Sequence, residues 1–130
     1  MIYLDSSAVV KLVHVEPQTP ALRAWLTASG QPALVSSLLA HVEGARALRR
    51  TDAAALVNLP LVLGAINMIA IDATVCGAAA AHPDPLLRSR DAIHLATAAM
   101  VGPAPTSFVT YDKRLAAAAT AAGLPVAAPS

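Results

Sequence analysis

The sequence predicts an α/β fold, a three-layer α/β/α sandwich in which helices cover both faces of a mainly parallel sheet of four or five strands. Short strand-like segments alternate with helical segments along the whole chain, and this order is typical of βαβ crossovers. The chain has 130 residues, 56% of them hydrophobic, which is enough to bury one core. We therefore expect one domain over residues 1–130.

The first half of the chain is predicted to contain two strands and three helices. Each strand is a short apolar run, and each helical stretch follows a Ser or Thr, whose side-chain oxygen can accept a hydrogen bond from a free backbone N–H. Glycine readily adopts the left-handed conformation that ends helices, so Gly30 ends the second helix. The predicted strands are 2–4 and 34–36, and the predicted helices are 8–13 after Ser6-Ser7, Thr19-Pro20 to Gly30, and Ser37 to Leu48 followed by Arg49-Arg50.

The second half continues the alternation and includes one stretch with the length of a membrane span. Residues 53–71 carry no charge. Pro60 and Gly64 interrupt this stretch, so we interpret it as a helix, a turn and a strand. The predicted strands are 67–71, 107–111 and an edge strand at 125–127, and the predicted helices are Thr51-Asp52 to Pro60, 73–81, Arg90 to Met100 after a Ser89 cap, and Asp112 to Ala122.

Composition excludes several classes of protein. Nine Lys and Arg against eight Asp and Glu give a nearly balanced charge, which favours neither nucleic acid nor a membrane. Cys76 is the only cysteine, which excludes an intramolecular disulfide and gives no support for a thiolate zinc cluster. Residues 1–5 lack the basic segment and apolar run of a signal peptide, so we expect a cytoplasmic protein.

Four acidic residues are candidates for one functional site. Asp5 and Asp112 each follow a predicted strand, Asp91 lies in the first turn of its helix, and Glu43 lies farther along another helix. Because functional groups gather at the carboxyl ends of parallel strands, the four side chains can converge at one edge. Crowded carboxylates repel, so they need protons, cationic side chains or a metal ion. Oxygen ligands without Cys or a His pair favour Mg²⁺ or Mn²⁺, which hold and activate water and orient a phosphate.

A structural role explains each acid singly. The three aspartates stand near helix N-termini, where capping and the helix dipole favour Asp, and Glu43 can pair with Arg46. His94 lies one turn after Asp91 on the same helix face, but its apolar neighbours indicate a hydrogen-bonded core histidine rather than a ligand. From the residues alone, a metal site and these structural roles remain alternatives.

Four segments of the chain resemble the acidic motifs of PIN-domain nucleases, and more narrowly those of VapC toxins. The match covers essentially the whole chain in the right order. Its most specific part is Asp-Ala-Ile-His-Leu-Ala at 91–96, followed by Thr-x-Asp after a strand. The resemblance implies a PIN-like fold. The matching segments are Ile2 to Ala8, Glu43 inside a helix, Arg90 to Ala98 and Thr110 to Leu115.

The resemblance implies a Mg²⁺- or Mn²⁺-dependent endoribonuclease that acts as the toxin of a toxin–antitoxin pair. Its substrate would be transfer or ribosomal RNA, and a cognate VapB-type antitoxin would neutralise it. Many relatives carry a further acid just after the last acidic position, where two basic residues stand here, so the number of metal ions stays open. Carried over position by position, the catalytic and metal-binding acids are Asp5, Glu43, Asp91 and Asp112, and the supporting hydroxyls are Ser7 and Thr110.

Basic residues flank the acidic positions and are candidates for RNA binding. Setting the four acids aside leaves nine Lys and Arg against four acids, a surplus that suits a polyanion, although helix-end charge pairing explains some positions equally well. Aromatic residues are too few for a base-stacking platform, so recognition should use phosphate contacts and shape. The candidates are Lys11, Arg46, Arg49, Arg88, Arg90, Lys113 and Arg114.

Two other functions stay open. A catalytically inactive PIN-like module that binds its antitoxin or another protein would carry the same motifs. A small phosphatase or phosphotransferase would use Asp5 as its nucleophile. Charged residues make up only 13% of the chain, which fits a groove for an amphipathic antitoxin segment and a homodimer face. We expect no membrane partner. The abundant alanine is an alternative explanation for the low charge, since it raises the apolar count but adds little apolar area.

Overall fold

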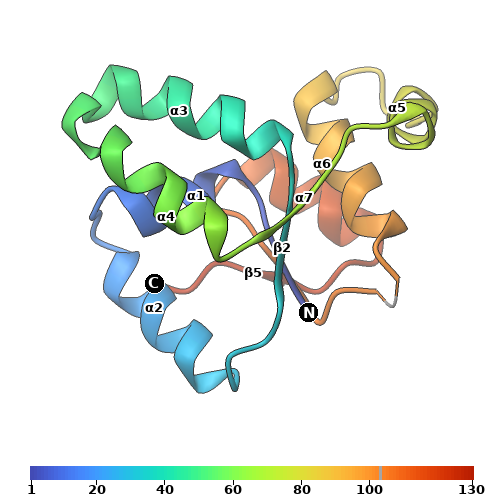
Figure 1. Cartoon of the computed structure of the whole chain (residues 1–130). Coiled ribbons are helices and arrows are strands. Elements are labelled where there is room, and N and C mark those ends of the chain that lie inside the picture. The colour runs from blue at the N-terminus through green and yellow to red at the C-terminus, as the bar shows by residue number, and fades with distance from the viewer. Residues whose placement is uncertain (103) are drawn as a thin grey trace.

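Five short strands form one parallel sheet in the computed structural model, which describes residues 1–102 and 104–130. The strand order is β3-β2-β1-β4-β5, and Figure 1 shows the strands running between two groups of helices. The predicted three-layer fold with a parallel sheet is therefore confirmed. The strands are β1 (Ile2–Leu4), β2 (Leu34–Ser37), β3 (Asn67–Ile69), β4 (Ser107–Val109) and β5 (Val126–Ala127).

The central strand β1 ends where the candidate site residue Asp5 begins the next segment. Ile2, Tyr3 and Leu4 are all buried, because a central parallel strand has helices on both of its faces. β1 pairs with β2 on one side and with β4 on the other. The carboxyl ends of β1 and β4 therefore lie side by side. Asp5 and Asp112 come shortly after these two ends.

Helices cover the two faces of the sheet. Ile2 and Leu4 face a core formed with α1 to α4, and Tyr3 faces a second core formed with α6 and α7, because alternate residues of a strand point to opposite faces. Helix α5 packs against α6. The helices are α1 (Ser6–Val13), α2 (Thr19–Ala28), α3 (Leu39–Thr51), α4 (Leu59–Gly64), α5 (Ala73–Ala80), α6 (Ser89–Met100) and α7 (Lys113–Ala121), with a 3₁₀ helix η1 at Ala53–Asn58.

The segment around Pro60 differs from the prediction of one helix from Thr51-Asp52 to Pro60. Helix α3 continues to Thr51, Asp52 leaves the helical conformation with ψ 76°, and η1 and α4 follow. Pro60 lies in the first turn of α4, where its missing N–H is not needed, so it begins a helix instead of ending one. No helix in the described part of the chain is long and apolar enough to cross a membrane.

Several predicted helix caps are wrong, including Thr19, which is the first residue of α2, and two strands are shorter than predicted. Asp5, rather than Ser6-Ser7, caps α1 through a hydrogen bond from the Ala8 N–H. Ser89 is the first residue of α6, and Arg88 in the cap position makes no capping hydrogen bond. The strands predicted at 67–71 and 107–111 end at residues 69 and 109. Asp and Ser serve equally well as caps, so neighbouring candidates are not distinguished by residue type.

Candidate active site

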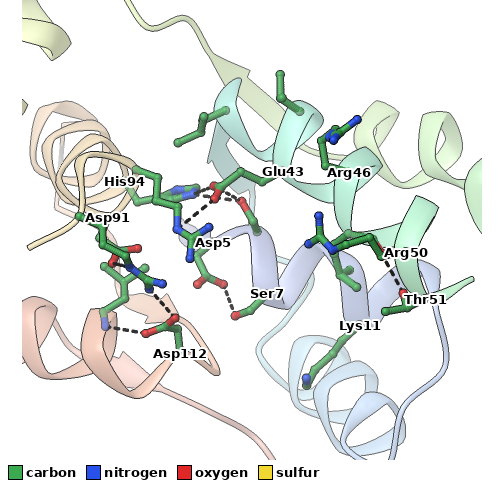
Figure 2. Close-up of a pocket in the computed structure, with 18 of the residues that line it drawn as sticks. Asp5, Ser7, Lys11, Glu43, Arg46, Arg50, Thr51, Asp91, His94 and Asp112 are labelled. Carbon is green, nitrogen blue, oxygen red and sulfur yellow. Dashed lines mark hydrogen bonds and ion pairs between the residues drawn. The ribbon is translucent and has the colours of Figure 1, made fainter.

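A pocket of about 660 Å³ lies where the strands β1 and β4 end. All four predicted acids line this pocket, and they come from four places in the fold: the end of β1, α3, α6 and the start of α7. Figure 2 shows Asp5, Glu43, Asp91 and Asp112 grouped at one end of it. The convergence expected from the parallel sheet is therefore present.

Asp5 is the most buried of the four acids, at 3% exposure. Its Oδ1 accepts hydrogen bonds from Ser7 Oγ at 2.6 Å and from the Ala8 N–H at 3.0 Å. Its Oδ2 accepts from Thr110 Oγ1 at 2.6 Å. Burial raises the pKa of the Asp5 carboxyl above its ordinary value, although these hydrogen bonds lower it. The two predicted hydroxyls thus hold this carboxylate in one orientation.

Arg88 joins two of the other acids. Its Nε donates to Asp91 Oδ2 at 2.8 Å, and its Nη2 donates to Asp112 Oδ2 at 2.7 Å. Asp112 also caps α7, since its Oδ1 accepts from the N–H groups of Arg114 and Leu115. Burial would raise the pKa of Asp112, but the Leu115 N–H and Arg88 hold it below its ordinary value. Arg88, predicted to bind RNA, is engaged here with the acids of the pocket.

Glu43 and His94 form the remaining part of the cluster. Glu43 Oε1 accepts from Ser6 Oγ at 2.7 Å and lies 2.9 Å from His94 Nε2. Its Oε2 lies 3.8 Å from Arg90 Nε. Burial would raise the pKa of Glu43, but the hydrogen bonds with His94 and Ser6 outweigh burial and lower it. In the described residues Glu43 forms no ion pair with Arg46, so the structural pairing considered for it is not found.

The basic residues predicted to bind RNA divide into two groups. Lys11 lines the pocket, but Glu16 lies 2.6 Å from its Nζ, which also lies 4.4 Å from the centre of the Tyr111 ring, so its charge is already balanced. Arg46 is exposed, and so is Arg50, which was not among the predicted RNA-binding residues; within the described ranges neither forms an ion pair. The pocket is lined by Lys11, Arg46, Arg50, Arg88 and Arg90, whereas Arg49, Lys113 and Arg114 are not among its lining residues.

The donor chemistry of this pocket fits a hard divalent cation. Carboxylates and hydroxyls offer the oxygen ligands that Mg²⁺ and Mn²⁺ prefer. Among residues 1–102 and 104–130, however, no three His, Cys, Asp or Glu side chains are placed to hold one metal ion together. Arg88 instead balances the charge of Asp91 and Asp112. A metal ion at these two carboxylates would therefore compete with the guanidinium.

Three residues of the cluster were not assigned to the site by sequence reasoning: Tyr3, Ser6 and His94. His94 is 2% exposed and hydrogen-bonded, as predicted for a core histidine, but its partner is one of the site acids. Its spacing from Asp91 was the available signal, because residues three apart share a helix face. Tyr3 offered no comparable signal, since its contact with His94 joins residues 91 positions apart.

Known proteins similar to this chain belong to one family. The PIN domain family model matches residues 2–121. Ribonuclease VapC35 of Mycobacterium tuberculosis is 47% identical over 99% of this chain and 97% of its own length. Ribonuclease VapC47 of the same species is 39% identical over the same shares of the two chains.

Solved structures with the same fold include two proteins of low sequence identity. The crystal structure of M. tuberculosis VapC20, described as a sarcin–ricin loop cleaving toxin, gives a TM-score of 0.77 at 20% identity and covers 99% of this chain and 100% of that one. VapBC2 from Rickettsia felis, bound to a DNA fragment from their promoter, gives 0.74 at 14% identity over the whole of both chains. The family model and the more similar relatives establish membership: the chain belongs to the PIN-domain family and, within it, to the VapC group.

Proposed function

We propose that the chain is a metal-dependent endoribonuclease that acts in the cytoplasm as the toxin of a toxin–antitoxin pair. The observation that carries this proposal is the convergence of four carboxylates, from separate elements, on one pocket. Capping and ion pairing account for each acid singly, but they give no reason for all four to share a cavity. The ribonuclease names of the relatives support the same activity.

In this proposal the four acids hold Mg²⁺ or Mn²⁺, which when bound supplies an activated water and stabilises the leaving oxygen of the cleaved bond. Ser7 and Thr110 fix the orientation of the Asp5 carboxylate through short hydrogen bonds. His94 fixes Glu43 in the same way. Ligands that are held in place lose little freedom when an ion binds, so these contacts favour binding.

The proposed substrate is RNA, bound through its phosphates. Arg46, Arg50 and Arg90 are exposed and line the pocket beside the acids. The planar guanidinium group matches the geometry of a phosphate and can donate two hydrogen bonds to it. We propose transfer or ribosomal RNA, because VapC20, which shares the fold, is described as a toxin that cleaves the sarcin–ricin loop.

A VapB-type antitoxin is the proposed partner, with a homodimer as the proposed assembly. The pocket has an apolar part lined by Val10, Leu39 and Val42, and Val42 is exposed. An amphipathic segment of an antitoxin could cover this surface. Co-expression with the small protein of a neighbouring gene should give a complex that co-purifies. Purification of the two proteins apart from each other would contradict the pairing.

The nuclease proposal is tested by RNA cleavage in the presence of Mg²⁺ or Mn²⁺. Asp5→Asn should lower the cleavage rate by at least about 100-fold, since a ligand of the ion and a negative charge are both lost. Asp84→Asn, which changes an exposed carboxylate outside the pocket, is the matched control and should cleave like the wild type. Equal, metal-independent activity in the wild type and Asp5→Asn would contradict the proposal.

The arrangement around Arg88 keeps an inactive binding module as a second candidate. A pocket whose acids are neutralised by a guanidinium needs no metal to be stable. In that case Mn²⁺ would not raise the melting temperature, whereas a metal enzyme should be stabilised by its ion. An aspartyl-phosphate enzyme would use Asp5 as its nucleophile, and the hydrogen bonds of Asp5 do not separate this role from metal binding, because Oδ2 accepts only from Thr110. A trapped phosphate on Asp5 would distinguish it.

A further inference from the structure

A series of buried and partly buried hydrogen bonds leads from the central strand to Glu43. The Tyr3 hydroxyl lies 2.8 Å from His94 Nδ1, and His94 Nε2 lies 2.9 Å from Glu43 Oε1. Ser6 Oγ lies 2.7 Å from the same carboxylate oxygen and 3.1 Å from His94 Nε2. These hydrogen bonds thus join β1, the start of α1, α6 and α3.

The rings of Tyr3 and His94 in this series of hydrogen bonds are packed too closely to rotate. Tyr3 is 1% exposed and His94 2% exposed. The Tyr3 ring stacks on Phe108, with 5.0 Å between centroids, and meets the His94 ring edge-on at 5.9 Å. Burying a hydroxyl or an imidazole group lowers the stability of the fold unless the group is hydrogen-bonded. Each proton on these two groups must therefore point at an acceptor.

With one proton on the His94 ring, the donors and acceptors admit one self-consistent arrangement of protons. Ser6 Oγ donates its proton to Glu43 Oε1, so it can only accept from His94 Nε2. The ionised carboxylate of Glu43 also only accepts, which places a proton on Nε2. In that arrangement Nδ1 carries no proton and accepts, so the Tyr3 hydroxyl, 2.8 Å away, is its donor. Burial raises the pKa of Tyr3, so this hydroxyl keeps its proton.

We propose that Tyr3 and His94 are positioning residues for Glu43: Tyr3 fixes His94 in the Nε2–H tautomer, and His94 directs that N–H at Glu43 Oε1. The consequence for metal binding rests on the proposed function, in which Glu43 is a ligand. With Oε1 held by His94 and Ser6, the rotamer of Glu43 is set, and Oε2 lies beside Arg90, which lines the same pocket. Contacts that orient the ligands of a metal typically change its affinity by about 10- to 100-fold.

Two variants of His94 separate positioning from packing. His94→Gln places an amide N–H near the position of Nε2, and His94→Asn places one near the position of Nδ1. Both variants remove the ring and stay polar and uncharged, so their melting temperatures without metal should fall by similar amounts. In titrations with Mn²⁺ alone, His94→Asn should bind about 10- to 100-fold more weakly than the wild type, and His94→Gln should recover most of this loss. Equal affinities in the two variants would overturn the proposal.

The tautomer itself is read from the ¹⁵N shifts of the His94 ring in metal-free protein, with neither RNA nor Mn²⁺ present. The wild type should show a protonated Nε2 and an unprotonated, hydrogen-bonded Nδ1. Tyr3→Phe should shift the Nδ1 resonance, because its donor is lost. A protonated Nδ1 in the wild type, or an unchanged spectrum in Tyr3→Phe, would overturn the proposal. A wild type that binds no Mn²⁺ but shows the expected tautomer would contradict the proposed function and support the positioning of Glu43.

Discussion

Asp5 and Asp112 each combine a structural and a chemical role. Asp5 caps α1 and Asp112 caps α7, while both carboxylates line the same pocket. The two roles use one property, an oxygen that accepts hydrogen bonds at a helix N-terminus, where the helix dipole also stabilises negative charge. Substitution by Asn keeps a capping oxygen and removes the charge, whereas Ala removes both. Asn is therefore the substitution that separates the roles.

The carboxyl of Asp5 should destabilise the metal-free fold as the pH rises. Its pKa is raised in the folded state, chiefly by burial. Its stabilising contribution is therefore complete below the unfolded pKa of about 3.9 and is lost as the pH rises through the folded pKa. We expect Asp5→Asn to melt at a higher temperature than the wild type at neutral pH, with the difference shrinking as the pH is lowered. Thermal melts with a chelator measure this, and a lower melting temperature of Asp5→Asn at neutral pH would contradict it.

Arg88 should stabilise the metal-free protein and oppose metal binding. Without its guanidinium, Asp91 and Asp112 lose their cation, and Arg88→Gln should lower the free energy of unfolding by about 1–2 kcal/mol, given that this side chain is partly exposed. Mn²⁺ should then raise the melting temperature more in Arg88→Gln than in the wild type. Arg90→Gln is the control, because Arg90 is more exposed and lies 3.8 Å from its acid. The same Mn²⁺ effect in all three proteins would show that Arg88 does not compete with the ion.

The elements of the fold were predicted wherever a local pattern determines them. The strand ending before Asp5 and the helix over residues 90–100 follow from apolar periodicity and capping residues within a few positions, whereas the strand predicted at 67–71 is present but ends at Ile69. The region after Thr51 was predicted less well, because Pro60 serves either to end a helix or to occupy its first turn. Tertiary packing decides between these, and Leu59 next to it is buried in the core.

The site was predicted to the extent that sheet topology determines it. A parallel sheet brings the ends of β1 and β4 together, which places Asp5 and Asp112 near each other without knowledge of any side-chain contact. The partners of the acids were not predictable in this way. The bond from Arg88 to Asp112 spans 24 positions and the one from His94 to Glu43 spans 51, and no local pattern encodes such pairs.

Helix α5 offers a test that separates capping from catalysis. Asp72 caps α5 through a 2.8 Å hydrogen bond from the Val75 N–H, as Asp112 caps α7, but Asp72 does not line the pocket. Asp72→Ala should lower the free energy of unfolding by about 1 kcal/mol and leave RNA cleavage unchanged. Asp112→Ala should lose stability and activity together. Denaturant unfolding and cleavage assays on both variants check this, and a large loss of cleavage in Asp72→Ala would contradict the division of roles.

Across the whole molecule, the pocket holds its acids and two arginines without ion pairs in the described residues at different places. Its acidic end holds the four carboxylates, and Arg46 and Arg50 lie farther along α3 (Figure 2). The overall charge of +1 conceals this separation, because opposite charges cancel in the sum. An RNA strand that reached the acids would have its neighbouring phosphates near these arginines. Its backbone would thereby be oriented for cleavage while its bases remained free of specific contacts.

The salt dependence of RNA binding tests this arrangement. For a single strand, each phosphate contact contributes about 0.7 to the slope of log affinity against log salt concentration, so replacing Arg46 and Arg50 by Gln should reduce the slope by about 1.4. Binding is measured in an Asp5→Asn background, which prevents cleavage. Arg23→Gln, an exposed position on α2 outside the pocket, should leave the slope unchanged. A slope that is the same in all these proteins would show that the RNA backbone does not lie along α3, and the arginines near the acids would then have to be assigned to the antitoxin interface.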